Sequence, residues 1–204
     1  MKILKKNDGR FLKTLIQLPS ILFSAPVVTA VCTIAITKFV DNLGLIVSSV
    51  FFYILTPILA YVYLYKKGLI TDKGLDFNIR KREERPLYNI IITLGFLTNY
   101  ILFFIYKVPG ADKIALFLLL SFLLFTIVTF FWKISGHMTQ TVLCILTLAY
   151  VFPDVRIYIL LAGYLICVPL VALSRIKLKH HNIWQVIAGT LATSAVGLLV
   201  FTIL

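Results

Sequence analysis

Two short polar segments carry the histidines of this chain, and both interrupt apolar sequence. The first is Trp132-Lys133-Ile134-Ser135-Gly136-His137, and the second is Ser174-Arg175-Ile176-Lys177-Leu178-Lys179-His180-His181. A basic run that ends in Arg85-Pro86 occupies the corresponding place one apolar hairpin earlier. Ionisable residues at the ends of membrane helices are candidates for function by default. If the three clusters lie on one side of a membrane, they form a cationic, histidine-bearing site suited to phosphate.

The composition indicates that lipid is the solvent for most of the chain. Of the 204 residues, 60% are hydrophobic, and 20 Lys and Arg against 8 Asp and Glu give a net charge of +12. The basic residues lie between apolar segments, which favours anionic headgroups and phosphate-bearing lipids over nucleic acid as partners. The three cysteines fall inside apolar runs, and their odd number and spacing indicate neither a disulfide framework nor a metal site.

Seven apolar segments must position these clusters. They cover approximately residues 21–40, 45–65, 87–106, 114–132, 138–152, 157–173 and 184–204. Backbone polar groups in hydrocarbon must be satisfied within a segment, so we expect an all-α, polytopic helical bundle that forms one membrane domain over residues 1–204. The helix count is seven, or six if the first segment, which Pro26 interrupts, lies in the interface. The short segment 138–152 indicates an oblique crossing, a start inside a polar cavity or a thinned bilayer.

The polar joints determine which helix ends meet. Several joints are tight turns rich in Pro, Gly, Asp and Asn, whereas residues 66–86, 133–137 and 174–185 form long or basic joints. Two helices separate each basic joint from the next, and an even number of crossings returns the chain to the same face. We therefore predict that all three basic joints lie on one face of the membrane.

The distribution of positive charge predicts the orientation. Residues 1–18 form a basic tail, and we expect a retained first helix after it because no small-x-small cleavage site is evident. With seven helices, the tail shares the face of the basic joints, and only four of the 20 Lys and Arg lie on the other face, namely Lys38, Lys107, Lys113 and Arg156. The positive-inside rule then predicts a cytoplasmic site, in what we expect to be the plasma membrane.

In order, spacing and residue type, the three clusters resemble the type-2 phosphatidic acid phosphatase and vanadium haloperoxidase superfamily. Its pattern is Lys with Arg-Pro seven residues later, then Ser-Gly-His, then Ser-Arg, five residues, His, three residues and Asp. Arg85-Pro86 matches the end of the first part, Ser135-Gly136-His137 the second, and Ser174-Arg175 with His181 the third. The resemblance covers about residues 66–204 and is closest to membrane lipid phosphatases.

The resemblance implies a role for each matching residue. His181 would attack phosphorus to give a phosphohistidine, and His137 would protonate the departing alkoxide and then help to activate water. The groups expected to bind phosphate oxygens are Arg85, Arg175, Ser135, Gly136 and Ser174. The implied activity is hydrolysis of a lipid phosphate monoester or a polyprenyl diphosphate, without a metal ion or other cofactor.

The first part of the pattern departs from the family at its cation. Asn78 stands where the family has Lys. Lys81 lies four residues before Arg85, on the same face if the segment is helical, so we expect Lys81 to supply the missing charge. Arg80 and Arg82 are the alternatives.

The third part departs at the residue that follows His181 by four positions. Gln185 stands where the family has Asp. A glutamine carbonyl can accept the Nδ1–H bond and orient the ring, but it supplies no negative charge to a developing imidazolium. The analogous loss in a serine protease triad costs about 10⁴ in turnover. We interpret Gln185 as a catalytic residue in a working variant of the site.

Two other functions compete with hydrolysis. One is a phosphotransferase that uses the same site to pass phosphate to another lipid or a sugar. The other is a catalytically inactive homologue that binds lipid, which Asn78 and Gln185 motivate. A transporter is a weaker alternative because no acidic residue lies deep in an apolar segment to couple ions. A membrane lipid is the expected partner in each enzymatic case, and the oligomeric state is left open.

Overall fold

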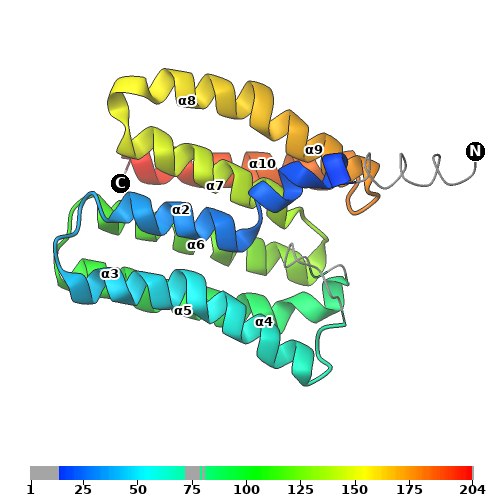
Figure 1. The fold of residues 1–204 in the computed structure, drawn as a ribbon, viewed down its shortest axis with the longest axis horizontal. Coiled ribbons are helices and arrows are strands. Elements are labelled where there is room, and N and C mark those ends of the chain that lie inside the picture. Colours follow the sequence, from blue (N-terminus) through cyan, green and yellow to red (C-terminus); the bar gives the residue numbers. More distant parts are fainter. Residues whose placement is uncertain (1–13, 72–78, 80, 204) are drawn as a thin grey trace, which may run out of the picture.

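The computed structural model describes residues 14–71, 79 and 81–203, and every regular element in these ranges is helical (Figure 1). Residues 14–22 form a first helical stretch. The elements that follow are α2 (Ala25–Ile36), α3 (Leu43–Val50), η1 (Phe51–Leu55), α4 (Thr56–Lys66), η2 (Arg82–Glu84), α5 (Arg85–Ile105), α6 (Ala111–Phe131), α7 (Gly136–Val151), η3 (Pro153–Val155), α8 (Arg156–Ala162), η4 (Gly163–Cys167), α9 (Val168–Lys177), α10 (Ile183–Leu198) and η5 (Leu199–Ile203). The predicted all-α class is confirmed.

Six helical runs within the described ranges are long and apolar enough to cross a membrane. They are Thr14–Ile36, Leu43–Lys66, Arg82–Ile105, Ala111–Phe131, Pro153–Lys177 and Ile183–Ile203, and α7 is a shorter apolar helix between the fourth and fifth. Three of the runs contain a π-helical turn without losing continuity, at η1, η4 and η5. The predicted apolar segments therefore correspond to these seven runs.

The first run crosses the bundle instead of lying flat along its surface. Val28, Cys32 and Ile36 are at most 1% exposed and belong to the main core. The interruption lies at Phe23 and Ser24, where the backbone of Ser24 is extended. Pro26 sits in the first turn of α2, where a missing N–H breaks no intrahelical hydrogen bond, so this proline begins a helix and does not interrupt one.

Exposed and buried side chains are distributed as in a protein whose solvent is lipid. Large apolar side chains cover the outside; Leu165 is 70% and Ile203 is 72% exposed. Many buried threonine hydroxyl groups bond to the carbonyl one turn earlier in their own helix, as Thr33 does to Thr29 and Thr126 to Phe122. This arrangement satisfies polar groups without water. Together with the six long apolar helices, it identifies an integral membrane protein.

The short helix α7 lies inside the bundle, which explains how 16 residues suffice for it. It packs against α2, α6, α8, α9 and α10, and eleven of its side chains are buried. The first residue of α7 follows the buried pair Ile134 and Ser135. These buried residues agree with one of the predicted explanations, a start inside a polar cavity of the protein.

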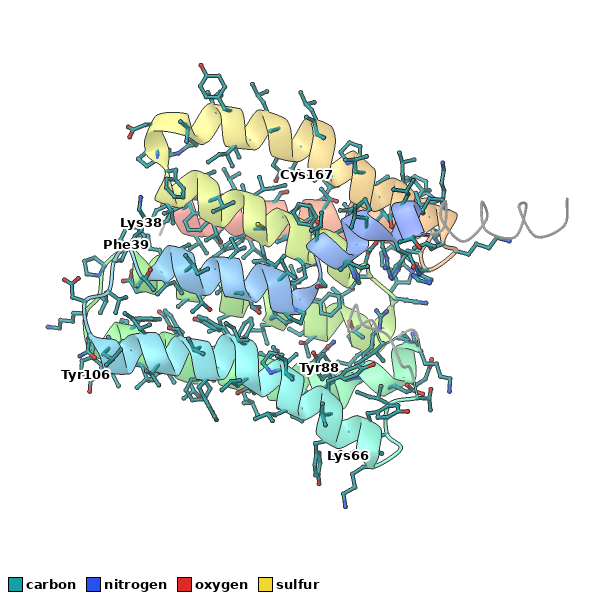
Figure 2. All side chains as sticks on the ribbon, viewed as in Figure 1. Lys38, Phe39, Lys66, Tyr88, Tyr106 and Cys167 are labelled. Carbon is teal, nitrogen blue, oxygen red and sulfur yellow. The ribbon has the colours of Figure 1, made fainter. Side chains whose placement is uncertain are left out.

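The polar joints separate into two ends of the bundle. Figure 2 shows Lys38 and Tyr106 at one end and Lys66 at the other. The joints after α4, α6 and α9 all lie at the end that carries Lys66 (Figure 1). Hydrogen bonds connect these joints, because Arg85 donates to the Ile134 carbonyl and the Ser135 N–H donates to the Gln185 carbonyl.

Candidate active site

The end of α9 brings Arg175 and His181 together through a tight helix cap. Lys179 adopts a left-handed conformation with φ 56°, and its N–H donates to the Ile176 carbonyl at 2.9 Å. The N–H groups of His180 and His181 both donate to the Arg175 carbonyl, at 3.1 and 3.3 Å. These bonds form a Schellman-type cap that reverses the chain. The cap therefore accounts for the sequence spacing between the arginine and the second histidine.

The start of α10 orients the His181 ring. The Asn182 side chain accepts the Gln185 N–H at 3.0 Å, and Gln185 Oε1 accepts the Asn182 N–H at 3.3 Å, which is a capping box. Gln185 Oε1 also lies 3.0 Å from His181 Nδ1. A carbonyl oxygen only accepts hydrogen bonds, so Nδ1 carries the proton and Nε2 keeps its lone pair. The predicted contact between His181 and Gln185 is present.

Gln185 also connects this histidine to the Ser-Gly-His segment. Its backbone carbonyl accepts the Ser135 N–H at 3.2 Å. One turn later, Gly189 allows α10 to approach the same loop, because a Cβ atom there would stand 2.8 Å from the Ser135 carbonyl oxygen. The first two turns of α10 thus position both segments.

Replacing Gly189 with alanine should lower the thermal unfolding temperature of the protein in detergent. The added methyl group forces the Ser135 backbone away from α10, and overpacking of this kind costs about 1–3 kcal/mol. Gly95→Ala is the matched control, because a Cβ at this helical glycine meets its nearest neighbour at 3.5 Å, an ordinary contact. An equal decrease in both variants would show that the close approach at Gly189 has no special cost.

The Ser-Gly-His segment presents the N-terminus of α7 to the site. Ser135 is the N-cap residue, yet its hydroxyl forms no capping bond. Its Oγ is fully buried and has no hydrogen-bond partner within the described part of the chain. The N–H groups of the first helical turn, which have no carbonyl partner within the helix, and the positive end of the helix dipole make this position favourable for an anion. Ser135, Gly136 and the adjacent His137 can therefore donate to phosphate oxygens.

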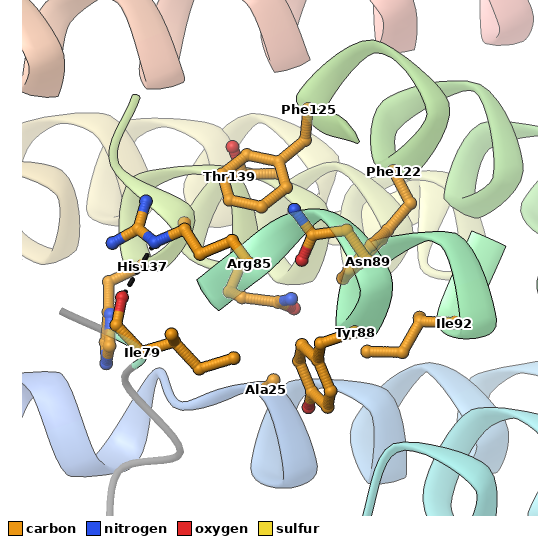
Figure 3. Close-up of a pocket in the computed structure, with 12 residues that line it drawn as sticks. Ala25, Ile79, Arg85, Tyr88, Asn89, Ile92, Phe122, Phe125, His137 and Thr139 are labelled. Carbon is orange, nitrogen blue, oxygen red and sulfur yellow. Dashed lines mark hydrogen bonds between the residues drawn. The ribbon is translucent and has the colours of Figure 1, made fainter. Parts of the chain in front are cut away.

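Arg85 is held at the first turn of α5 by carbonyl groups from two joints. Its Nε donates to the Ile79 carbonyl at 2.7 Å (Figure 3). Its Nη1 donates to the Ile134 carbonyl at 3.2 Å. Arg85 is 5% exposed and Arg175 is completely buried. Two guanidinium groups in the protein interior produce a strongly positive site, which an anionic ligand would neutralise.

The environment keeps His181 uncharged. Burial lowers the pKa of its imidazole to about 3, and the positive charges of Arg85, Arg175 and Lys133 act in the same direction. The hydrogen bond to Gln185 raises the pKa but does not offset these effects. At neutral pH, the ring is therefore the neutral tautomer that carries hydrogen on Nδ1, which leaves Nε2 available as a nucleophile.

Two predicted phosphate-binding residues have other contacts. Lys81 forms an ion pair with Glu84 at 3.1 Å, and its side chain is 61% exposed. It precedes a 3₁₀ turn and has an extended backbone, so the helical spacing that placed it beside Arg85 does not apply. Ser174 is buried and shares a 2.6 Å hydroxyl–hydroxyl hydrogen bond with Ser20. Asn78 and Arg80 lie outside the described residues.

A pocket of about 70 Å³ adjoins the site and contains residues that the sequence analysis did not single out. It is lined by Ala25, Ile79, Arg85, Tyr88, Asn89, Ile92, Phe122, Phe125, Gly136, His137, Thr139 and Gln140. Tyr88 and Asn89 follow Arg85 by three and four positions on α5, and Gln140 follows His137 by three on α7. Helical periodicity from the two motif residues is the signal that could have identified them.

Comparison with known proteins gives one match. The model of the PAP2 superfamily matches residues 128–204, a range that contains Ser135, His137, Arg175 and His181. No curated protein and no solved structure matches the chain. The matched range and the geometry around it agree with the family expected from the motifs. Residues 128–204 of this chain therefore match the PAP2 superfamily, whose members are generally phosphatases.

Proposed function

We propose that this protein is a lipid phosphate phosphatase that hydrolyses a lipid phosphate monoester or a polyprenyl diphosphate through a phosphohistidine. The observation that carries the proposal is the neutral His181, oriented by Gln185 and surrounded by Arg85, Arg175 and Lys133. A nucleophile among buried cations is the arrangement that attack on a phosphate requires.

The proposed reaction has two steps and uses only residues of this chain. His137 enters the first step as an imidazolium ion. His181 Nε2 attacks phosphorus while Nδ1 keeps its proton, the bond from phosphorus to the leaving oxygen breaks, and the His137 imidazolium gives a proton to that oxygen and becomes neutral. Water then attacks the phosphohistidine, His137 takes a proton from this water, and the phosphorus–nitrogen bond breaks to release phosphate. Arg85, Arg175 and the Ser135 hydroxyl stabilise the equatorial oxygens in both steps.

Phosphate release from a panel of lipid phosphates and prenyl diphosphates tests the proposal. Purified wild-type protein should release phosphate well above a His137→Ala variant, and acid-labile ³²P should accumulate on wild-type protein with labelled substrate. Product analysis with added alcohol acceptors separates hydrolysis from phosphotransfer. If no substrate in the panel is turned over faster by wild type than by His137→Ala, the protein is a lipid-binding homologue and not an enzyme.

The pH dependence should show an unusually low acid limb. His181 attacks only when it is neutral, and its pKa of about 3 in the free site keeps it neutral down to low pH. Because kcat/KM reports the free enzyme, its acid limb should show no loss from His181 near the ordinary histidine pKa of about 6.5. The ionisation of the substrate phosphate, measured separately, is the control. If kcat/KM instead decreases below pH ~6.5 because His181 becomes protonated there, this expectation is wrong.

Lys133 is a better candidate than Lys81 for the cation missing from the first motif. The charge of Lys133 acts on His181, whereas Lys81 is exposed and paired with Glu84. Lys133→Met should lower kcat/KM by about tenfold because it removes positive charge from the phosphate site. Lys81→Met, the matched control, should change kcat/KM by less than about twofold. A larger decrease in kcat/KM for Lys81→Met than for Lys133→Met would instead support the phosphate-binding role that the sequence suggested for Lys81.

We also propose that the end of the bundle with the site faces the cytoplasm of the plasma membrane, as the positive charge distribution predicts. Lys177 and Lys38 lie in exposed positions near opposite ends. In a variant with the three native cysteines replaced by alanine, a membrane-impermeant maleimide should label Lys38→Cys but not Lys177→Cys on intact cells. The opposite labelling would place the site outside.

A further inference from the structure

The pocket beside His137 extends into the bundle from one side of the histidine pair. Figure 3 shows Arg85, Ile79 and His137 toward one end, and Ile92 and Phe122 toward the other. The lining positions on α5 (Arg85, Tyr88, Asn89 and Ile92) follow one helical face over two turns, which is about 10 Å. Neither His181 nor Arg175 is among the lining residues. The pocket therefore borders the proposed general acid, and the proposed nucleophile is not part of its wall.

This position is the place for the leaving group. In an in-line displacement, the departing oxygen lies on the opposite side of phosphorus from the attacking nitrogen. His181 attacks from one side, and the proton donor His137 must reach the oxygen on the other side. The group attached to that oxygen then extends into the space that His137 and Arg85 border.

Three residues that line the pocket carry buried polar atoms, which indicate what this group contains. Tyr88 Oη, Asn89 Nδ2 and Gln140 Oε1 have no hydrogen-bond partner within the described residues. Asn89 and Gln140 are 3% and 5% exposed, so bulk water does not surround their side chains. Buried polar groups are ordinarily paired, and a pocket with three such atoms at its wall is suited to a ligand that pairs with them.

The three atoms require both kinds of partner. Tyr88 and Asn89 can donate to an oxygen of the ligand, whereas the Gln140 carbonyl accepts only from an O–H or N–H group. A hydrocarbon chain such as a prenyl group would leave all three unpaired. A second phosphate would suit Arg85 and the two donors, but at neutral pH it offers little hydrogen to the Gln140 carbonyl. Ile92, Phe122 and Phe125 cover the remaining wall and fit the carbon skeleton.

Building on the proposed phosphatase function, we propose that this pocket binds the leaving alcohol and selects lipid phosphates whose alcohol carries a hydroxyl or amide N–H beside the phosphate ester. Tyr88, Asn89 and Gln140 are the residues that determine this specificity. Prenyl phosphates and prenyl diphosphates are the disfavoured substrates.

A matched pair of substrates tests the proposal. One is lysophosphatidate, whose glycerol has a free secondary hydroxyl, and the other is its deoxy analogue, in which hydrogen replaces that hydroxyl. Wild-type kcat/KM should favour lysophosphatidate by about tenfold, as expected when a site pairs buried polar groups with a substrate hydroxyl. The ratio of the two kcat/KM values should fall to about one in Gln140→Met. It should also decrease in Tyr88→Phe and Asn89→Leu.

Asn99→Leu is the control for the asparagine substitution. Asn99 is a buried asparagine of the same helix that bonds to Ser48 and Ser49, away from the pocket. This variant should keep the wild-type preference. Tyr88→Phe removes a single oxygen, so it provides a test even if the larger replacements destabilise the protein. A wild-type ratio near one, or an unchanged ratio in Gln140→Met and Tyr88→Phe, would overturn the proposal.

Binding measurements separate failure of this inference from failure of the proposed function. Non-hydrolysable phosphonate analogues of the same two lipids should show the same preference in Kd for wild type, and Gln140→Met should abolish it. If no phosphate is released but the Kd preference is present, the pocket assignment holds and the phosphatase proposal fails. Farnesyl diphosphate is the third ligand to be measured. If it binds more tightly than the lysophosphatidate analogue, and Asn89→Leu weakens its binding, the pocket binds a second phosphate and the proposed alcohol site is wrong.

Discussion

Replacement of His181 by alanine should reduce phosphate release by about 10³-fold or more, the largest loss expected for any single site in this protein. The variant lacks the nitrogen that forms the bond to phosphorus in the proposed reaction. The protein should still fold, because the imidazole contributes one side-chain hydrogen bond at the start of α10. Phosphate release, acid-labile labelling and thermal unfolding temperature should be measured together.

His180, the residue before His181, provides a matched control for this substitution. His180 has the same side chain and a backbone N–H that bonds to the same Arg175 carbonyl, but it is one position out of the motif register. His180→Ala should change turnover by no more than about threefold, since a residue outside the reacting geometry contributes little transition-state binding. Equal losses of turnover in His180→Ala and His181→Ala would indicate a general effect on the cap at the end of α9. The proposal of a phosphohistidine at His181 would then be wrong.

Gln185→Leu should produce the second large effect, a decrease in kcat of about 10²-fold or more. The substitution removes the acceptor that fixes His181 as the Nδ1–H tautomer, and loss of a comparable orienting group costs about 10⁴ in serine proteases. It also deletes one bond of the capping box, for which about 1 kcal/mol of stability is expected. A single-turnover measurement should show that formation of the phosphohistidine is the step that slows.

Gln185→Glu is the informative counterpart. Glutamate keeps the length of glutamine and the capping box, and it adds a negative charge beside Nδ1. That charge raises the pKa of His181 from about 3, so the acid limb of kcat/KM should shift to higher pH than in wild type. Stabilisation of the imidazolium that forms on attack should increase the rate of phosphohistidine formation. Gln185→Asp is one methylene shorter and should reach His181 less well. If the acid limb of kcat/KM lies at the same pH in Gln185→Glu and in wild type, His181 is not the group that produces it.

Helix parity alone predicted that the three polar joints would meet. Residues 66–86, 133–137 and 174–185 are separated by pairs of apolar segments, and the hydrogen bonds from Arg85 to Ile134 and from Ser135 to Gln185 cross between them. The contact of Gln185 with His181 was also predictable, since a spacing of four residues at the start of a helix permits it.

The details that the sequence did not reveal depend on local backbone conformation and on packing. Helical spacing placed Lys81 beside Arg85, but the chain enters α5 through an extended residue and a 3₁₀ turn, so Lys81 points toward Glu84. Composition marked Tyr88, Asn89 and Gln140 only as polar residues in apolar segments. Their importance arises from helices that lie far apart in the sequence and enclose a common pocket.

The length of α7 has a consequence for how the protein meets the bilayer. Sixteen residues span about 24 Å, whereas the hydrocarbon core of a bilayer is about 30 Å thick. If Val151 lies at the opposite edge of the hydrocarbon core, Ser135 lies about 6 Å inside the near edge of an average membrane. A lipid must sink, or the surrounding leaflet must thin, before its phosphate reaches the histidines. Bilayer thickness would then set the rate of substrate capture, and short-chain lipids around the protein should make capture faster.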